Sequence, residues 1–342
     1  MHTILVTGGT GYIGSHTVVE LINEGFRVLI ADNLANSDTG VLDGIQEITG
    51  IRPGFEHLDI CDAEKLKGYL DSNPEIGAVI HFAAYKSVGE SVEKPLKYYR
   101  NNIVSLINLL EEMKSRSIAS LVFSSSCTVY GQPDQLPVTE SAPLKKACSP
   151  YGNTKQISED IIADFIKASP SIKSIALRYF NPVGAHPTAL IGELPRGVPD
   201  NLVPFITQTA IGLRDELKVF GNDYNTPDGS CIRDYLHVTD LARAHVAAIK
   251  RLLEGRNKDA LEFFNLGTGK GISVLEMINT FERVNSVSIN YTITGRRPGD
   301  IEQVWADTTL ANRELGWKAQ SSLEETLASA WKWEKYYRNN KA

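Results

Sequence analysis

Long hydrophobic runs, paired cysteines and an excess of positive charge are all missing from this sequence. No apolar stretch approaches the ~18 residues that a membrane-spanning helix needs. The segment from Met1 to Val6 has no basic start, and its apolar run is too short for a signal peptide. We therefore expect a cytoplasmic protein that does not enter a membrane.

The few cysteines and the charge balance exclude further classes. The four cysteines (Cys61, Cys127, Cys148 and Cys231) are scattered without a C-x-x-C pair, which favours free thiols in a reducing compartment. We assign no metal ligands. A net charge of −6 argues against a nucleic-acid binder, which usually needs a basic face. It leaves open a local site for an anionic ligand.

The N-terminal stretch "TILVTGGTGYIGSHTVVELINEGFRVLIADN" predicts a β-α-β unit. A β-branched run, residues 3–7, precedes a glycine-rich turn, and an apolar periodic segment, residues 13–21, predicts a helix. Gly25 ends that helix, and "RVLIAD" predicts a second strand.

Four glycines lie in the first strand-to-helix turn. Gly9, Gly11 and Gly14 fit G-x-G-x-x-G, and Gly8, Gly11 and Gly14 fit the related G-x-x-G-x-x-G spacing. Such a turn lets the backbone approach a pyrophosphate, which the helix N-terminus also attracts. Asp32, at the end of the second strand, can accept bonds from an adenosine ribose and would repel a 2′-phosphate, so NAD is favoured over NADP. The alternative is a glycine-rich turn in an unliganded α/β domain.

Strand-like and helix-like segments then alternate, which predicts an α/β fold with a doubly wound parallel sheet of the Rossmann type. The further predicted strands cover residues 54–60, 78–84, 120–126 and 174–181. Ligands of such sheets bind beyond the carboxyl ends of the strands. Ala83, Ala84, Ser124 to Ser126 and Asn181 should therefore converge near the glycine turn.

A change of character near residue 182 predicts a second, smaller α/β domain. Proline-rich loops are followed by short predicted helices around 201–213 and 239–253 and by strands near 217–220, 262–266 and 288–293. We expect an NAD-binding domain over 1–181 and a substrate-binding domain over 182–342, with some later segments returning to the first domain.

Two long predicted helices, residues 96–113 and 154–168, carry apolar faces that need partners. One partner is their own sheet. A second apolar surface, such as Ile162 and Ile166, suits a helical interface between two copies of the chain. We therefore expect a homodimer through these helices.

The stretch "SPYGNTK" carries the candidate chemistry. Pro150 suits the first turn of a helix capped by Ser149, which places Tyr151 and Lys155 on one face. A close cation favours the phenolate, and Lys155 together with an oxidised nicotinamide ring can lower the pKa of Tyr151 toward the range where it acts as a base. Ser126 can hydrogen-bond the same substrate hydroxyl. A Tyr-x-x-x-Lys spacing alone is usually a surface coincidence, so the interpretation depends on the NAD fold and the strand-terminal serine.

The motifs "TGGTGYIGSH", "HFAA", "SSSCTVYG", "SPYGNTK" and "RYFNPVGAHP" resemble those of the extended short-chain dehydrogenase/reductases. Within them the sequence is similar to the UDP-glucose 4-epimerase (UDP-galactose 4-epimerase) family. "VGESVEKPLKYYRNN", "FGNDY", "GSCIRDYLHVTDLA", "NLGTGKGISVLE" and "GRRPGD" continue the likeness over nearly the whole chain.

The resemblance implies reversible C4 epimerisation of a UDP-hexose through a 4-keto sugar, with the hydride held by tightly bound NAD. Tyr151 would be the base, with Lys155 and Ser126 as its catalytic partners. The implied NAD contacts are Gly8, Gly11, Tyr12, Ile13, Gly14, Asp32, Asn33, Asn36, Ser37, Asp59, Ile60, Phe82, Ala83, Lys86, Asn101, Ser124, Tyr151, Lys155 and Phe180. The implied UDP-sugar contacts are Ser126, Tyr151, Asn181, Asn201, Leu202, Phe220, Arg233, Tyr235, Arg297, Asp300 and Val304.

Departures from the family pattern leave alternatives open. Val304 is smaller than the tyrosine that goes with plain hexoses in the family, so UDP-N-acetylglucosamine is an alternative substrate. Related 4,6-dehydratases carry an Asp-Glu pair where this chain has Cys127 and Thr128, and UDP-glucuronate decarboxylases carry a glutamate at the second position. Such enzymes, and a non-catalytic nucleotide-sensing module, remain the competing interpretations. The role of Cys127 is open.

Overall fold

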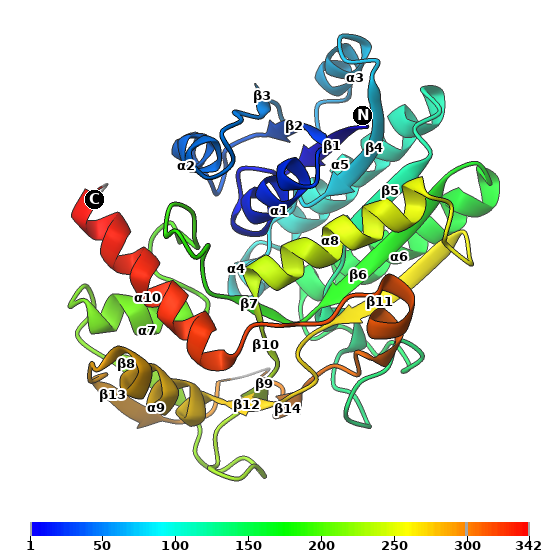
Figure 1. Cartoon of the computed structure of the whole chain (residues 1–342). Coiled ribbons are helices and arrows are strands. Elements are labelled where there is room, and N and C mark those ends of the chain that lie inside the picture. The colour runs from blue at the N-terminus through cyan, green and yellow to red at the C-terminus, as the bar shows by residue number, and fades with distance from the viewer. Residues whose placement is uncertain (1, 298–299, 341–342) are drawn as a thin grey trace.

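The computed structural model describes residues 2–297 and 300–340. Its largest element is a seven-stranded sheet whose paired strands are all parallel, in the order β11-β6-β5-β4-β1-β2-β3 (Figure 1). This confirms the predicted doubly wound sheet. The strands are β1 (Thr3–Thr7), β2 (Arg27–Asp32), β3 (Gly54–His57), β4 (Ile76–His81), β5 (Ser120–Ser124), β6 (Lys173–Tyr179) and β11 (Leu261–Leu266).

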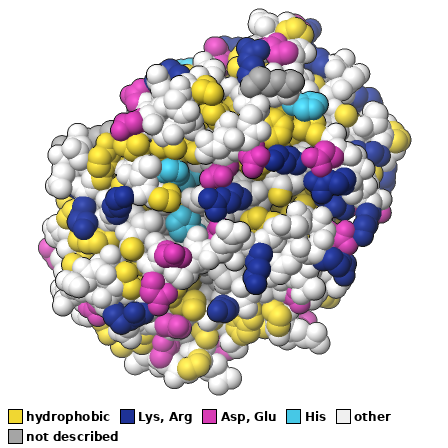
Figure 2. Space-filling view, in the orientation of Figure 1, with side chains coloured by type: hydrophobic (Ala, Val, Ile, Leu, Met, Phe, Trp, Pro, Cys, Tyr) yellow, Lys and Arg dark blue, Asp and Glu magenta, His cyan; other side chains and the backbone are white. Residues whose placement is uncertain are grey.

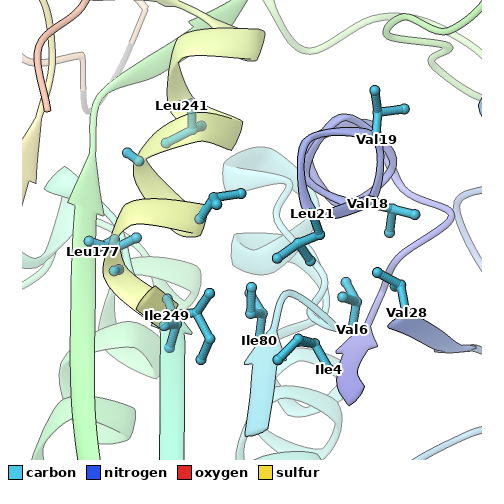
Figure 3. Close-up of a cluster of buried hydrophobic side chains, with 14 of the residues drawn as sticks. Ile4, Val6, Val18, Val19, Leu21, Val28, Ile80, Leu177, Leu241 and Ile249 are labelled. Carbon is cyan, nitrogen blue, oxygen red and sulfur yellow. The ribbon is translucent and has the colours of Figure 1, made fainter. Parts of the chain in front are cut away.

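Helices cover both faces of this sheet. One layer holds α1 (Tyr12–Asn23), α2 (Gly40–Thr49) and α8 (Val238–Leu253), and the other holds α3 (Ala63–Asp71), α5 (Pro95–Ser115) and α6 (Pro150–Ala168). Alternate residues of each strand enter different cores. In β1, Ile4 and Val6 face α1 (Figure 3), whereas Leu5 belongs to the core of the opposite layer. Each fully buried aliphatic side chain contributes about 1.5–3 kcal/mol, which explains the nearly continuous apolar strands.

The sheet includes a segment from the C-terminal half of the chain. β11 pairs with β6, and α8 packs beside α1 over the same sheet (Figure 1). The chain therefore returns to the large sheet after residue 182. The division into domains at that residue stays a prediction.

A smaller layer lies beyond the carboxyl ends of the large sheet, with its own core around Phe281 and Trp331. It contains short two- and three-stranded sheets. Its elements are β7 (Asn181–Val183), α7 (Leu202–Ala210), β8 (Leu217–Phe220), β9 (Ile232–Arg233), β10 (Tyr235–His237), β12 (Ile272–Ser273), α9 (Val274–Asn285), β13 (Tyr291–Thr294), β14 (Gln303–Val304) and α10 (Leu323–Asn340). Three short helices pack on the large-sheet layers instead: α4 (Val88–Glu93) contacts α5 and α6, η1 (Cys127–Tyr130) contacts α6 and β6, and η2 (Ala311–Leu315) contacts α8 and β11.

The prediction that Ile162 and Ile166 form an outer apolar surface of α6 is wrong. Ile162 is fully buried and Ile166 is 6% exposed, and both pack in the core between α6 and the sheet. Lys155 and Glu159 share this buried face. The face of α6 toward the sheet therefore differs from the predicted one. A hydrophobic pattern assigns these two charged side chains to solvent, whereas both face the interior.

The surface charges, the cysteines and the length of the helices bear on the expectations from composition. On the face in Figure 2, Lys and Arg side chains are scattered among Asp and Glu side chains. All four cysteines are free thiols. Among the described residues, no helix has the length and apolar character needed to cross a membrane.

Candidate active site

One cavity, of about 1350 Å³, opens where the large sheet's carboxyl ends meet the smaller layer. Every residue assigned above to catalysis, to NAD or to the UDP-sugar lines it. These residues come from segments as far apart as Gly8 and Val304. Two residues of the "GRRPGD" motif, Pro298 and Gly299, lie outside the described residues.

The glycine turn leaves no room for side chains. Gly8 has a φ of +73°, and a Cβ there would lie 2.7 Å from the backbone nitrogen of Ala83. A Cβ on Gly14 would lie 2.3 Å from the carbonyl oxygen of Gly8. Helix α1 starts after Gly11 with no side-chain cap. Its positive end therefore faces the cavity, as a pyrophosphate requires.

Asp32 is held rigidly beside this turn. One carboxylate oxygen accepts the N–H of Thr10 at 3.1 Å, and the other accepts the N–H of Leu34 at 2.9 Å and the hydroxyl of Ser37 at 3.3 Å. An ionised carboxylate offers about four lone-pair directions, so it retains capacity for a ribose hydroxyl. The residues at this end of the cavity therefore fit an adenosine diphosphate without a 2′-phosphate.

Helix α6 begins as the sequence predicts. Pro150 is its first residue, and the Ser149 hydroxyl accepts the N–H of Gly152 at 3.1 Å, an N-cap worth about 1 kcal/mol. This start orients Tyr151, which is 7% exposed, toward the cavity. Ser126 follows β5, where its hydroxyl accepts the N–H of Thr128 at 3.2 Å. The two candidate groups thus approach one another from β5 and α6.

Burial dominates the electrostatics of Tyr151 and Lys155. Burial raises the pKa of Tyr151, and the nearby Tyr179 adds to this, while a hydrogen bond with Ser126 lowers it. Lys155 donates at 2.6 Å to the backbone carbonyl of Ser124, and burial lowers its own pKa to about 8. Desolvation of the phenolate thus outweighs the hydrogen bond with Ser126. The lowering of the Tyr151 pKa by Lys155 together with an oxidised nicotinamide ring stays a prediction.

Two arginines and an aspartate line the other end of the cavity. Arg297 donates to both carboxylate oxygens of Asp300, at 2.8 and 3.2 Å, and Arg233 lies 3.7 Å from the same carboxylate. Phe220 lies under the Arg297 guanidinium, 5.5 Å from ring centre to Cζ. Asp300 thus orients two forked cations, an arrangement suited to a diphosphate.

Sequence reasoning missed a strap across the cavity. Glu193 accepts from Lys86 at 3.2 Å and from Asn201 at 2.7 Å, and Arg196 donates to the backbone carbonyls of Ala35 and Ser37. Apart from the bond between Glu193 and Asn201, these contacts join residues more than 100 positions apart in the sequence. The proline-rich composition of "GELPRGVPDN" predicted a loop but carried no signal of these partners.

Val304 and Cys127 also line the cavity. Val304 is 4% exposed and packs with Phe180 and Val129. Burial raises the pKa of the Cys127 thiol to about 12, so it is neutral at pH 7. Neither Cys127 nor Thr128 supplies a carboxylate.

The fold and this site define an extended short-chain dehydrogenase/reductase. A family sequence model described as GDP-mannose 4,6 dehydratase matches residues 5–330. UDP-glucose 4-epimerase of Yersinia enterocolitica is 52% identical over 333 residues, 97% of either chain. The chain belongs to the UDP-glucose 4-epimerase family.

Solved structures of the family are similar over nearly the whole chain. UDP-glucose-4-epimerase from Stenotrophomonas maltophila, with bound NAD and formylated UDP-arabinopyranose, has a TM-score of 0.95 at 47% identity over 99% of both chains. The Bifidobacterium longum UDP-glucose 4-epimerase, in complex with NAD⁺ and UDP, has a TM-score of 0.94 at 44% identity, over 98% of this chain and 99% of its own.

Proposed function

We propose that this protein is an NAD-containing isomerase that interconverts UDP-glucose and UDP-galactose by epimerisation at C4. The observation that carries the proposal is the single cavity, which joins three groups of residues. The glycine turn and Asp32 line one end, Arg233 and Arg297 the other, and Tyr151 lies with them in the same cavity. The related epimerases with bound NAD or UDP support this assignment.

When bound, NAD supplies a hydride acceptor and donor for C4 of the sugar. Tyr151 accepts the proton of the 4-hydroxyl and later returns it, and Ser126 hydrogen-bonds the same oxygen. Positioned proton transfer of this kind accelerates a reaction by roughly 10²–10⁴-fold. Because burial raises the pKa of Tyr151, its deprotonation depends on the positive charges of Lys155 and of the oxidised cofactor.

The arginines hold the diphosphate while the sugar changes its face. Arg233 is 17% exposed and is paired to the Asp300 carboxylate, which is 13% exposed, so Arg233 is more restricted than Arg297, which is 56% exposed. A 4-keto sugar attached to a diphosphate anchored in this way can turn and accept the hydride on its other face. A dehydratase or decarboxylase is disfavoured because Cys127 and Thr128 provide no carboxyl group beside the substrate.

The proposal extends to N-acetylated sugars as further substrates. Val304 lines the cavity and is smaller than tyrosine. A smaller side chain at this position supports acceptance of a C2 acetamido group, so UDP-N-acetylglucosamine should also be epimerised.

The proposed homodimer uses α5 and a corrected face of α6. Leu96, Val104 and Ile107 on α5 are 75%, 37% and 38% exposed. Ile157 and Ile161 on α6 are half-buried, and Ile161 also packs against the core that contains Ile166. These apolar side chains support pairing with a second copy of the chain.

Product analysis tests the function. The purified protein is incubated with UDP-galactose or UDP-N-acetylglucosamine, and the nucleotide sugars are separated by chromatography while absorbance at 340 nm follows free NADH. We expect the C4 epimer of each sugar without NADH in solution. Net NADH formation, or unchanged sugars from a protein without bound NAD, would reject the proposal.

A further inference from the structure

A buried polar cluster lies directly behind the candidate catalytic serine. Ser125, Glu159 and Arg178 come from the turn after β5, from α6 and from β6, and are 0%, 4% and 4% exposed. They do not line the cavity. The reaction proposed above gives them no direct role.

The cluster is closely connected. Arg178 forms a fork with Glu159, with nitrogen–oxygen distances of 3.0 and 2.7 Å, and the Ser125 hydroxyl donates to Glu159 at 2.6 Å. The third Arg178 nitrogen, Nη1, donates to the hydroxyl of Tyr130 at 3.0 Å. The guanidinium also lies 4.4 Å from the centre of the Phe263 ring. Charge-assisted, bidentate bonds of this kind fix geometry as well as add energy.

The residues that the Arg178–Glu159 pair contacts lie on both sides of Ser126. Ser125 precedes Ser126, and Tyr130 ends the short helix η1 that follows Ser126. The Arg178–Glu159 pair therefore holds both ends of the segment that presents Ser126. Glu159 itself lies on α6, two turns beyond Tyr151. One ion pair thus ties together the two elements that bring the catalytic groups into place.

A second link runs along α6. Glu159 lies one turn beyond Lys155, and its carboxylate opposes the effect of burial, which lowers the pKa of Lys155 to about 8. The other titratable groups around Lys155 and Ser124 are Tyr151, His81 and Tyr179. Burial lowers the pKa of His81 to about 3 and raises that of Tyr179 to about 12, so both are neutral at pH 7.

We propose that Glu159, held by Arg178, is a positioning residue of the epimerase site, acting through Ser125 on Ser126 and along α6 on Lys155. Fold stability alone explains the cluster poorly, because a buried ion pair is often no more stable than apolar residues of similar volume. This inference rests on the proposed function.

Ser125→Ala tests the first link, because it removes one hydroxyl and leaves the ion pair intact. The control is Ser174→Ala, an equally buried serine on β6 whose hydroxyl has no partner among the described residues. Rates are normalised to bound NAD. We expect kcat for UDP-galactose to fall about 10- to 100-fold in Ser125→Ala, with KM changed less than threefold and Ser174→Ala unaffected. A normalised kcat within twofold of wild type would overturn the role of Ser125.

The double variant Glu159→Gln/Arg178→Met tests the second link without leaving a buried charge unpaired. Loss of the carboxylate should lower the pKa of Lys155, so the alkaline limb of the kcat profile should move about one unit toward lower pH. A wild-type profile in a folded, NAD-loaded variant would overturn the proposal. If the variant does not fold, the Ser125→Ala comparison decides. An inactive wild-type protein would instead reject the proposed function.

Discussion

Replacing Tyr151 by phenylalanine removes the proposed base and little else. The tyrosine ring is 7% exposed and stays in place, and Ser126 keeps its bond from the N–H of Thr128. The lost hydrogen bond costs about 1 kcal/mol of stability, so the variant should fold and retain NAD. Loss of positioned proton transfer should reduce turnover by roughly 10²–10⁴-fold, or about 3–5 kcal/mol of activation free energy.

The assay follows conversion of UDP-galactose to UDP-glucose by chromatography. Bound NAD is measured after the protein is denatured, so that a loss of cofactor is not mistaken for a loss of chemistry. A Tyr151→Phe protein with full NAD content and at least half of the wild-type turnover would refute the base assignment.

Four further predictions concern the rest of the site and the surface. Turnover should fall as pH rises through about 8, because burial lowers the pKa of Lys155 to about 8 and the ammonium is then lost; an unchanged rate at pH 9 would contradict this. Asp32→Asn should reduce NAD retention and improve NADP binding to the apo protein at least tenfold, since repulsion of a 2′-phosphate reaches about 4 kcal/mol; unchanged selectivity in a reconstitution titration would count against Asp32. Val304→Tyr should abolish epimerisation of UDP-N-acetylglucosamine while preserving that of UDP-galactose, and equal loss of both would remove Val304 from specificity. Leu96→Glu should give a monomer in light scattering, and an unchanged mass would exclude this face as the interface.

The sequence predicts the parallel sheet and the cavity residues well because both depend on local signals. The glycine turn, the acid at the end of β2 and the serine beyond β5 occur at positions along the chain that are typical of a dinucleotide-binding site. The rule that ligands bind beyond the carboxyl ends of parallel strands then brings these segments together. The cavity confirms that they converge.

The strand ends and the place of β11 were less predictable. β4 ends at His81 and β5 at Ser124, although apolar or small residues continue to 84 and 126. Phe82, Ala83, Ala84 and Ser126 lie beyond the strand ends and line the cavity, whereas Ser125 does not line it. The composition of a segment does not show where the hydrogen bonds between neighbouring strands end. β11 pairs with β6 across almost 90 residues, and its sequence does not tell which sheet it joins.

The buried charged residues of α6 could not be predicted from the sequence either. Lys155 and Glu159 face the interior, so a pattern that assigns charges to solvent turns α6 the wrong way. Glu159 is compensated by Arg178 on β6, nineteen positions further along the chain. Such a pair becomes visible only when the fold has brought helix and strand together.

An isotope label tests the central claim most directly. UDP-galactose carrying deuterium at C4 is converted in ordinary water, and the UDP-glucose formed is examined by mass spectrometry and NMR. If the hydride leaves C4 and returns within the same site while Tyr151 handles only the hydroxyl proton, the product keeps its deuterium at C4. Loss of the label to solvent would contradict hydride return, and with it the proposed function of this cavity.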